Sequence, residues 1–181
     1  MQVIKTKIPG LKVIIPTVWE DQRGYFYESY HADRYRENGI DCTFVQDNES
    51  QSGYGVIRGL HYQTGPYAQG KLVRVIDGEV LDVVVDIRKD SPTYGHSLSL
   101  ILNDISKKQL FVPPGFAHGY AVLSETATFA YKCSKVYQPS HEGGILYKDP
   151  YLKINWMIPE KDRIISEKDQ SLPLFGDHLE N

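Results

Sequence analysis

Short extended segments, repeated at even intervals along the chain, limit the possible folds more than any other feature of this sequence. About ten such segments recur every 8–12 residues or so, and turn-forming residues separate them. This rhythm is typical of an antiparallel sandwich or barrel. The thirteen tyrosines fit the same interpretation, because tyrosine is favoured in strands and in polar pockets. We therefore predict an all-β fold, an antiparallel jelly roll with a few short helices, that forms one domain over residues 1–181.

Turn and helix signals place several elements within this pattern. Asp77-Gly78 lies between two alternating segments, residues 71–76 and 79–88, and predicts a β-hairpin. A helix is expected over residues 31–38, ended by Gly39. A second, shorter helix is expected near residues 160–170. The sequence shows no internal repeat, no low-complexity tract and no second core.

Charge and cysteine content exclude some classes of function. The formal net charge is −3 and no basic run occurs, so neither nucleic acid nor a membrane surface is expected as a main partner. No segment approaches the ~20 apolar residues of a membrane span. Cys42 and Cys133, in a chain without a signal-peptide pattern, predict free thiols in a reducing cytoplasm.

The segment from Gly55 to Gln63 places a cation and an imidazole on one predicted strand. Strict alternation puts Arg58 and His61 on opposite faces of that strand. Buried charge is costly unless it is paired, so two interpretations are open. Arg58 could face solvent with His61 as a hydrogen-bonded core residue, or the strand could hold a polar ligand inside a barrel. This segment alone favours the first interpretation.

A metal site is not expected, although one motif resembles a metal-binding pattern. Residues 113–118, ending in His118, resemble the second motif of cupins, P-x-G-x-x-H. The first cupin motif normally supplies a second close histidine, but here the sequence reads His61-Tyr62-Gln63. An amide in place of an imidazole removes a strong ligand, and three good ligands are the usual minimum for a catalytic site.

Acid–base chemistry is a second possibility for the same histidine. An imidazole accepts protons near neutral pH, and Asp169 could orient the ring of His61. The alternative for Asp169 is a place in the first turn of a short helix that Ser166 caps, and both interpretations can hold together. No nucleophile motif accompanies them.

Positive charges form a third group of candidates. Four cationic residues, scattered along the sequence, could be gathered by a barrel into an anion site: Arg23, Arg58, Lys71 and Lys168. Each of them singly is more often a solvated surface charge. The chain has no P-loop and no G-x-G-x-x-G motif, so the common nucleotide-binding loops are absent from the sequence.

Read together, a series of motifs resembles the dTDP-4-dehydrorhamnose 3,5-epimerase family, the nucleotide-sugar epimerases of the cupin superfamily. The motifs follow one another over nearly the whole chain, at residues 21–28, 44–48, 55–63, 68–73, 86–88, 91–93, 114–119, 131–132, 137–139 and 166–169. The resemblance implies a metal-free cupin jelly roll without a cofactor, usually a homodimer. In that family, the segment Arg23–Glu28 reaches into the neighbouring subunit's site.

The resemblance also implies a role for each candidate residue. His61, paired with Asp169, would be the general base, Tyr131 the general acid, and Lys71 would stabilise an enolate oxygen. Tyr137 is a rival proton donor. The implied substrate-binding residues are Arg23 and Arg58 with His118 and Lys168 for the diphosphate, Glu28, Gln46, Asp47 and Asn48 for the thymidine end, and Glu142 in the wall of the site.

The expected reaction is epimerisation of dTDP-4-dehydro-6-deoxy-D-glucose at carbons 3 and 5, in dTDP-L-rhamnose biosynthesis. Two alternatives stay open at this point. One is a monofunctional epimerase that acts on carbon 3 or carbon 5 of a dTDP-4-keto-6-deoxy sugar, as in antibiotic pathways. The other is a non-catalytic cupin that binds a sugar nucleotide.

Overall fold

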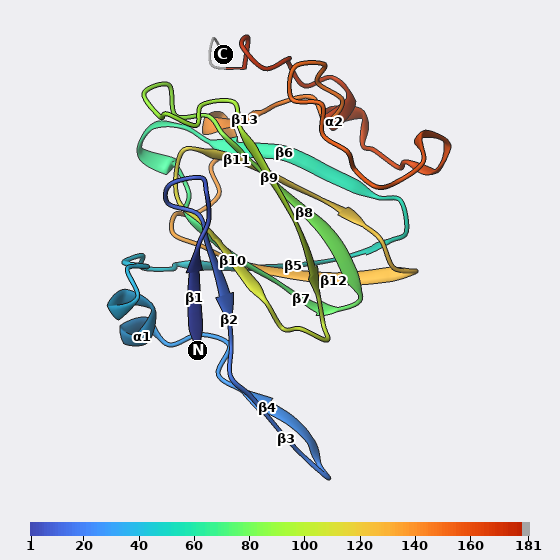
Figure 1. The fold of residues 1–181 in the computed structure, drawn as a ribbon. Coiled ribbons are helices and arrows are strands. Elements are labelled where there is room, and N and C mark those ends of the chain that lie inside the picture. Colours follow the sequence, from blue (N-terminus) through green and yellow to red (C-terminus); the bar gives the residue numbers. More distant parts are fainter. Residues whose placement is uncertain (179–181) are drawn as a thin grey trace.

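Two antiparallel sheets face each other in the computed structural model, which describes residues 1–178 (Figure 1). The six-stranded sheet has the order β1 (Gln2–Lys5), β2 (Lys12–Ile15), β10 (Gln109–Val112), β7 (Lys71–Asp77), β12 (Thr126–Cys133) and β5 (Gln46–Gly53). The five-stranded sheet has the order β13 (Glu142–Gly144), β6 (Ile57–Gln63), β11 (Phe116–Val122), β8 (Glu79–Asp86) and β9 (Ser97–Asn103). The predicted all-β jelly roll is confirmed. The last three residues of the predicted domain, 179–181, lie outside the described residues.

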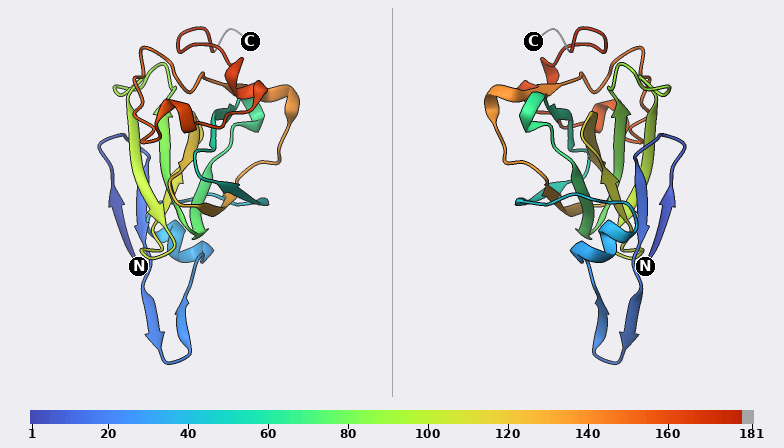
Figure 2. Two further views of the ribbon diagram at one scale, coloured as in Figure 1. Left: turned by 90° about the vertical axis from the view of Figure 1, so that its right-hand side faces the viewer. Right: turned by 90° about the vertical axis from the view of Figure 1, so that its left-hand side faces the viewer.

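Short elements complete the fold around the two sheets. The hairpin of β3 (Val18–Asp21) and β4 (Gly24–Tyr27) projects away from the barrel, as the two side views show (Figure 2). The helices are α1 (Ala32–Glu37), α2 (Glu167–Gln170) and the 3₁₀ turns η1 (Gly65–Tyr67), η2 (Pro139–His141) and η3 (Glu160–Asp162). Within residues 1–178, no helix is long and apolar enough to cross a membrane. Cys42 and Cys133 are both free thiols.

Apolar side chains fill the space between the sheets and also cover their outer faces. Val73 and Phe129 of the six-stranded sheet meet Val84 and Val122 of the five-stranded sheet in the inner core. On the outer face of the five-stranded sheet, the C-terminal segment packs its buried Trp156 among apolar side chains of β6, β8 and β11. This packing holds the segment that leads to α2 against the barrel.

The predicted hairpin over residues 71–88 is wrong, although its turn is present. β7 pairs with β10 and β12, whereas β8 pairs with β9 and β11, so the two strands lie in different sheets. Gly78 has a positive φ of 83° and carries the chain from one sheet to the other. A turn dipeptide predicts that the chain reverses, but it does not decide whether the strands pair or face each other across the core.

Strict alternation along β6 is also wrong, because the strand contains an extra residue. His61 lies opposite His118 and Arg58 lies opposite Tyr120, so three steps along β6 match two along β11. Gly59, with a φ of 124°, occupies this irregular stretch. Arg58 and His61 therefore line the same cavity, in which Arg58 remains exposed to solvent.

Candidate active site

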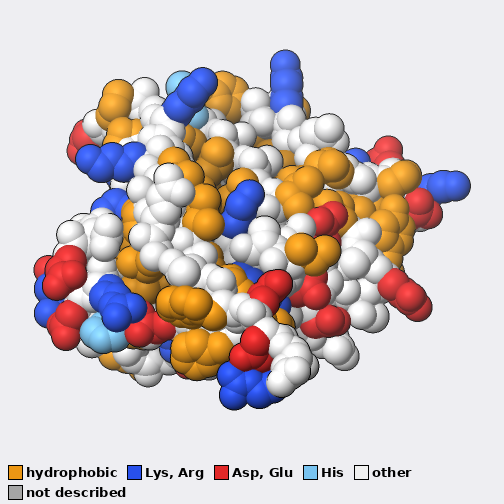
Figure 3. Space-filling view, turned by 60° about the horizontal axis from the view of Figure 1, so that its bottom comes forward, with side chains coloured by type: hydrophobic (Ala, Val, Ile, Leu, Met, Phe, Trp, Pro, Cys, Tyr) orange, Lys and Arg blue, Asp and Glu red, His pale blue; other side chains and the backbone are white. Residues whose placement is uncertain are grey.

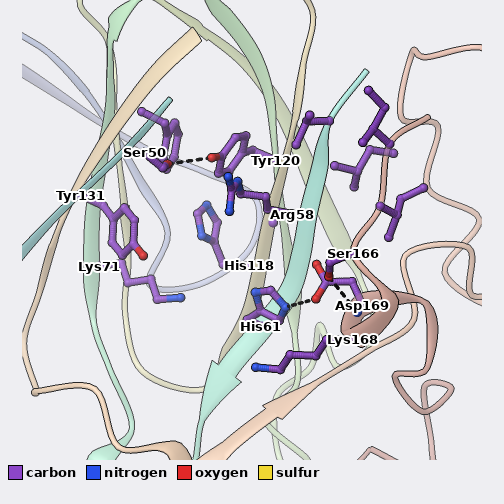
Figure 4. Close-up of a pocket in the computed structure, with 16 residues that line it drawn as sticks. Ser50, Arg58, His61, Lys71, His118, Tyr120, Tyr131, Ser166, Lys168 and Asp169 are labelled. Atoms are coloured by element: carbon purple, nitrogen blue, oxygen red, sulfur yellow. Dashed lines mark hydrogen bonds and ion pairs between the residues drawn. The ribbon is translucent and has the colours of Figure 1, made fainter. Parts of the chain in front are cut away.

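A cavity of about 580 Å³ opens between the sheets and carries most of the predicted site residues. Strands β5, β6, β7, β11 and β12 and the helix α2 contribute to its walls (Figure 4). Its polar lining consists of Ser50, Arg58, His61, Lys71, His118, Tyr120, Tyr131, Ser166, Lys168 and Asp169. Segments far apart in the sequence thus supply one concave, mixed polar and apolar surface of the kind that binds small molecules.

A second cavity of about 330 Å³ adjoins the first. Three residues line both of them, namely His61, Lys71 and Tyr131. The remaining lining of the second cavity is Gln46, Asn48, Tyr62, Gln63, Gln69, Tyr137 and Glu142. The imidazole, the ammonium and the phenol therefore stand where the two cavities meet.

His61 and Asp169 form a hydrogen-bonded pair at this junction. Nε2 of His61 lies 2.9 Å from Oδ1 of Asp169, and the Gly59 N–H donates to Oδ2 at 3.0 Å. Burial alone would raise the pKa of Asp169, but the hydrogen bonds and charge of His61 and the bond from Gly59 outweigh it and lower that pKa. The charged carboxylate favours a proton on Nε2 and leaves Nδ1 free to accept one.

The helix α2 explains how the carboxylate reaches its place. Ser166 caps the helix, with its hydroxyl accepting the backbone N–H of Asp169 at 3.1 Å. Asp169 is buried, with 4% of its surface exposed. Both interpretations of Asp169 hold together, since the same residue lies in the first turn of α2 and contacts His61.

Lys71 and Tyr131 come from neighbouring strands, β7 and β12, across the cavity from the His61–Asp169 pair (Figure 4). The Lys71 ammonium lies 5.9 Å from the centre of the Tyr131 ring. Burial lowers the pKa of Lys71 and raises the pKa of Tyr131. The phenol is therefore protonated at neutral pH and has a proton to give.

Glu142 joins α2 to the wall of the second cavity. One of its oxygens, Oε2, accepts from the Lys168 ammonium at 2.6 Å and from the Tyr137 hydroxyl at 2.8 Å. Burial alone would raise the pKa of Glu142, but these two donors lower it, and the same bonds raise the pKa of Lys168 and of Tyr137. The Tyr137 hydroxyl is thus engaged by a carboxylate.

Polar partners inside the barrel orient the rest of the first cavity. The Arg58 guanidinium donates to the Ser52 hydroxyl, with Nε at 3.2 Å and Nη2 at 3.1 Å. His118 is buried and its Nε2 lies 2.8 Å from Oδ2 of the buried Asp82. Within residues 1–178, Arg58 makes no ion pair with a carboxylate, so its charge is available to an anionic ligand.

Three predicted binding residues lie outside both cavities. Arg23, at the tip of the β3–β4 hairpin, pairs with Asp21. Glu28 pairs with Arg34 at 3.0 Å, and Asp47 lies 2.9 Å from the Lys132 ammonium. A single chain does not bring these residues together with His61.

The end of the molecule that carries the hairpin is rich in exposed apolar side chains. Figure 3 shows hydrophobic side chains lying among charged ones on this face. Trp19, Tyr25 and Phe26 of the hairpin are all more than half exposed, with Phe26 at 71%. Patches of this kind on a single chain often mark a contact surface.

The structure also adds residues that the sequence interpretation missed. Tyr120 lines the first cavity and its hydroxyl lies 2.9 Å from that of Ser50. Tyr120 follows His118 by two residues on a predicted strand, so period-two alternation could have placed it on the same face. Ser50 gave no such signal, because β5 is polar throughout and continues five residues beyond the predicted end at Asn48.

Comparisons with known proteins agree with this geometry. The family model described as dTDP-4-dehydrorhamnose 3,5-epimerase matches residues 5–177. The chain is 49% identical over 183 aligned positions to the dTDP-4-dehydrorhamnose 3,5-epimerase of Salmonella typhimurium, covering 99% of this chain and 98% of that protein.

Solved structures indicate the same family. The structure of dTDP-4-dehydrorhamnose 3,5-epimerase from Elizabethkingia anophelis is 50% identical, with a TM-score of 0.94 and coverage of 98% of this chain and 97% of that one. A Legionella pneumophila dTDP-6-deoxy-D-glucose-3,5-epimerase, in complex with dTDP-4-keto-L-rhamnose, is also 50% identical, with a TM-score of 0.93 and coverage of 97% and 93%. This chain belongs to the dTDP-4-dehydrorhamnose 3,5-epimerase family.

Proposed function

We propose that this protein is an isomerase that converts dTDP-4-dehydro-6-deoxy-D-glucose to dTDP-4-dehydro-L-rhamnose by inverting carbons 3 and 5. One observation carries the proposal for this chain's own residues. The His61–Asp169 pair faces Lys71 and Tyr131 where the two cavities meet. Family membership over residues 5–177 and the sugar nucleotide bound by the Legionella pneumophila relative support the same substrate class.

The chemistry follows from the residue types. The protons on carbons 3 and 5 are both α to the keto group, so removal of either gives an enolate. Nδ1 of His61 takes the proton, and Asp169 stabilises the imidazolium that forms. The Lys71 ammonium stabilises the enolate oxygen, a contact typically worth roughly 3–4 kcal/mol.

Tyr131 returns a proton from the opposite face, which inverts the carbon. Because one base and one acid serve two carbons, the sugar ring must shift between the two inversions. Loss and return of a proton leave the oxidation state of the sugar unchanged. We therefore expect turnover without an added cofactor.

The remaining residues suit an elongated anionic ligand. The thymidine end would lie along Gln46, Asn48 and Glu142 in the second cavity. The diphosphate would lie beside Lys168, between the cavities, where it competes with Glu142 for the ammonium. Arg58 and His118 add donors from the first cavity.

The protein is further proposed to act as a homodimer in which Arg23 and Glu28 complete the neighbouring site, with Asp47 at its rim. Mixing Arg23→Ala with His61→Asn tests this arrangement. If the site is shared, half of the randomly mixed dimers contain one intact site, so about a quarter of wild-type activity returns. A mixture as inactive as its components, with exchange of subunits verified by mass spectrometry, would contradict it.

Two coarser properties are proposed with this function. Residues 1–181 form a single domain, which predicts one cooperative unfolding transition by both calorimetry and circular dichroism. The protein resides in the cytoplasm, in line with its free thiols. Fractionation of the cells that produce it tests the location.

Proton NMR of the 4-keto sugar nucleotide in deuterated water tests the activity itself. We expect deuterium at carbons 3 and 5 with wild type, none with His61→Asn, and wild-type incorporation with His96→Asn, which changes an exposed histidine in the same way. Exchange at one carbon alone would indicate a monofunctional epimerase. Binding without exchange would indicate a non-catalytic sugar-nucleotide protein.

A further inference from the structure

The loop of residues 134–138 is held in place largely by glutamine side chains. It joins β12 to η2 without regular secondary structure and carries Tyr137 to the wall of the second cavity. Gln69 Nε2 donates to the Lys135 carbonyl at 2.7 Å, and Gln63 Nε2 donates to the Val136 carbonyl at 3.2 Å. Gln46 Oε1 accepts the Tyr137 N–H at 2.9 Å, and Gln63 Oε1 accepts the Gln138 N–H at 2.7 Å.

Gln63 is the central member of this set. It is 7% exposed, and its Nε2 also donates to the Tyr67 carbonyl at 2.8 Å. Its amide therefore accepts one backbone N–H and donates to two backbone carbonyls, which ties the 134–138 loop and the turn η1 to the strand that carries His61. No carboxylate of the same shape could replace it, because one oxygen would face two carbonyl oxygens.

These bonds fix both ends of Tyr137. Gln46 holds its backbone N–H, Gln63 holds the residues on either side, and Glu142 accepts its hydroxyl at 2.8 Å. Glu142 is itself the partner of Gln63 in the pairing of β13 with β6. The position of the Tyr137 ring relative to His61 is thus set through Gln63.

We propose that Gln63 is a positioning residue for the substrate. Through the 134–138 loop it sets the place of Tyr137 in the wall of the second cavity, and with it the affinity for the nucleoside end. The inference rests on the proposed function for the identity of this ligand. It assigns Gln63 no contact with the reacting atoms, so its loss should raise KM far more than it lowers kcat.

The Gln63→Glu variant is the direct test. At pH 8 we expect KM to rise roughly tenfold and kcat to change less than about threefold, because the new carboxylate repels the two carbonyls. Lowering the pH protonates this carboxyl, which can then donate again, so its KM should return toward wild type. The control is Gln51→Glu, which adds the same charge at an exposed position outside both cavities and should match wild type at each pH.

A double-mutant cycle shows whether Gln63 acts through Tyr137. In a Tyr137→Ala background, the Gln63→Glu change should raise KM less than about twofold. An equal rise in both backgrounds, or a Gln63→Glu variant with wild-type KM, would overturn the proposal. If Gln63→Glu does not fold, Gln63→Met replaces it, because it removes the same hydrogen bonds without adding a charge. An unchanged KM would then overturn the proposal equally.

Calorimetric titration with dTDP separates this inference from the proposed activity. We expect the dissociation constant for dTDP to rise in the same order as KM across these variants. A wild type that binds dTDP without turning over the sugar nucleotide would contradict the proposed reaction but leave the binding series as a test of Gln63. A wild type that does not bind dTDP would contradict both.

Discussion

Replacing Asp169 by asparagine tests the proposed base most directly, because the two side chains have nearly the same shape. The carboxylate faces two donors, His61 Nε2 at 2.9 Å and the Gly59 N–H at 3.0 Å. An amide has only one acceptor atom. It must either donate to Nε2, which moves the imidazole proton to the nitrogen needed as base, or point its NH₂ group at the Gly59 N–H.

The loss of charge gives the size of the effect. Deprotonation of the sugar makes an imidazolium beside Asp169, and two unit charges ~4 Å apart attract by about 4 kcal/mol at an effective dielectric constant of ~20. At 1.36 kcal/mol per factor of ten, the Asp169→Asn change should lower kcat about 10³-fold. KM should change little, because the polar atoms of Asp169 bond within the protein.

Initial rates of deuterium incorporation into the sugar, measured by NMR at saturating substrate, provide the assay. Asp33→Asn is the matched control, since it makes the same chemical change on the exposed surface of α1 and should leave kcat unaltered. Melting curves confirm that both variants fold. An Asp169→Asn enzyme that folds and keeps kcat within tenfold of wild type would refute the orienting role of Asp169.

Three further substitutions separate the other contributions. Lys71→Met should lower kcat by about 10²–10³. It should not lower the melting temperature at pH 7, because burial lowers the pKa of Lys71 and the variant no longer buries an ammonium. A clear drop in melting temperature would contradict this. Tyr131→Phe should slow formation of inverted product by about 10²-fold or more, while deuterium exchange into the unreacted substrate persists. If inversion and exchange were lost equally, another residue would be the acid. Asp86→Asn should destabilise the fold. Burial alone would raise the pKa of Asp86, but bonds from Arg88, Ser91 and Thr93 lower it from 3.8 to about 2. That shift stabilises the fold by about 2 kcal/mol above pH ~4, and this stability is lost as the pH falls toward ~2. The free energies of unfolding of wild type and variant, measured by urea titration, should therefore converge in acid. A difference that stays constant with pH would contradict this.

The sequence predicts the strands of this protein better than it predicts their partners. Residues 109–112 and 116–122 form strands close to the predicted places, because apolar runs and the break at residues 113–115 are local signals. The assignment of β7 and β8 to different sheets depends on which faces the inner core covers, and Gly78 alone does not encode that. The helix over residues 31–38 is confirmed with bounds of Ala32–Glu37, since both of its end signals are local.

The sequence likewise predicts some parts of the candidate site and not others. His61, Lys71 and Tyr131 meet in one chain, as do Arg58, His118 and Lys168. The sheet order places the first five of these residues, and α2 carries Lys168. Arg23, Glu28 and Asp47 do not join them. Their charges pair with Asp21, Arg34 and Lys132, respectively. The roles implied by the resemblance stay predictions for all of these residues until the variants are measured.

The extra residue in β6 makes the length of this strand as important as its composition. Arg58 and His61 share one face only because three steps on β6 match two on β11. Inserting one more residue between them would match four steps on β6 to three on β11 and turn one of the two toward the outer core, where Leu60 and Tyr62 pack. A single-codon insertion at this interval would therefore abolish activity without removing either functional side chain. Libraries built on this scaffold can vary the residues between Arg58 and His61, but they must not add a residue to this interval.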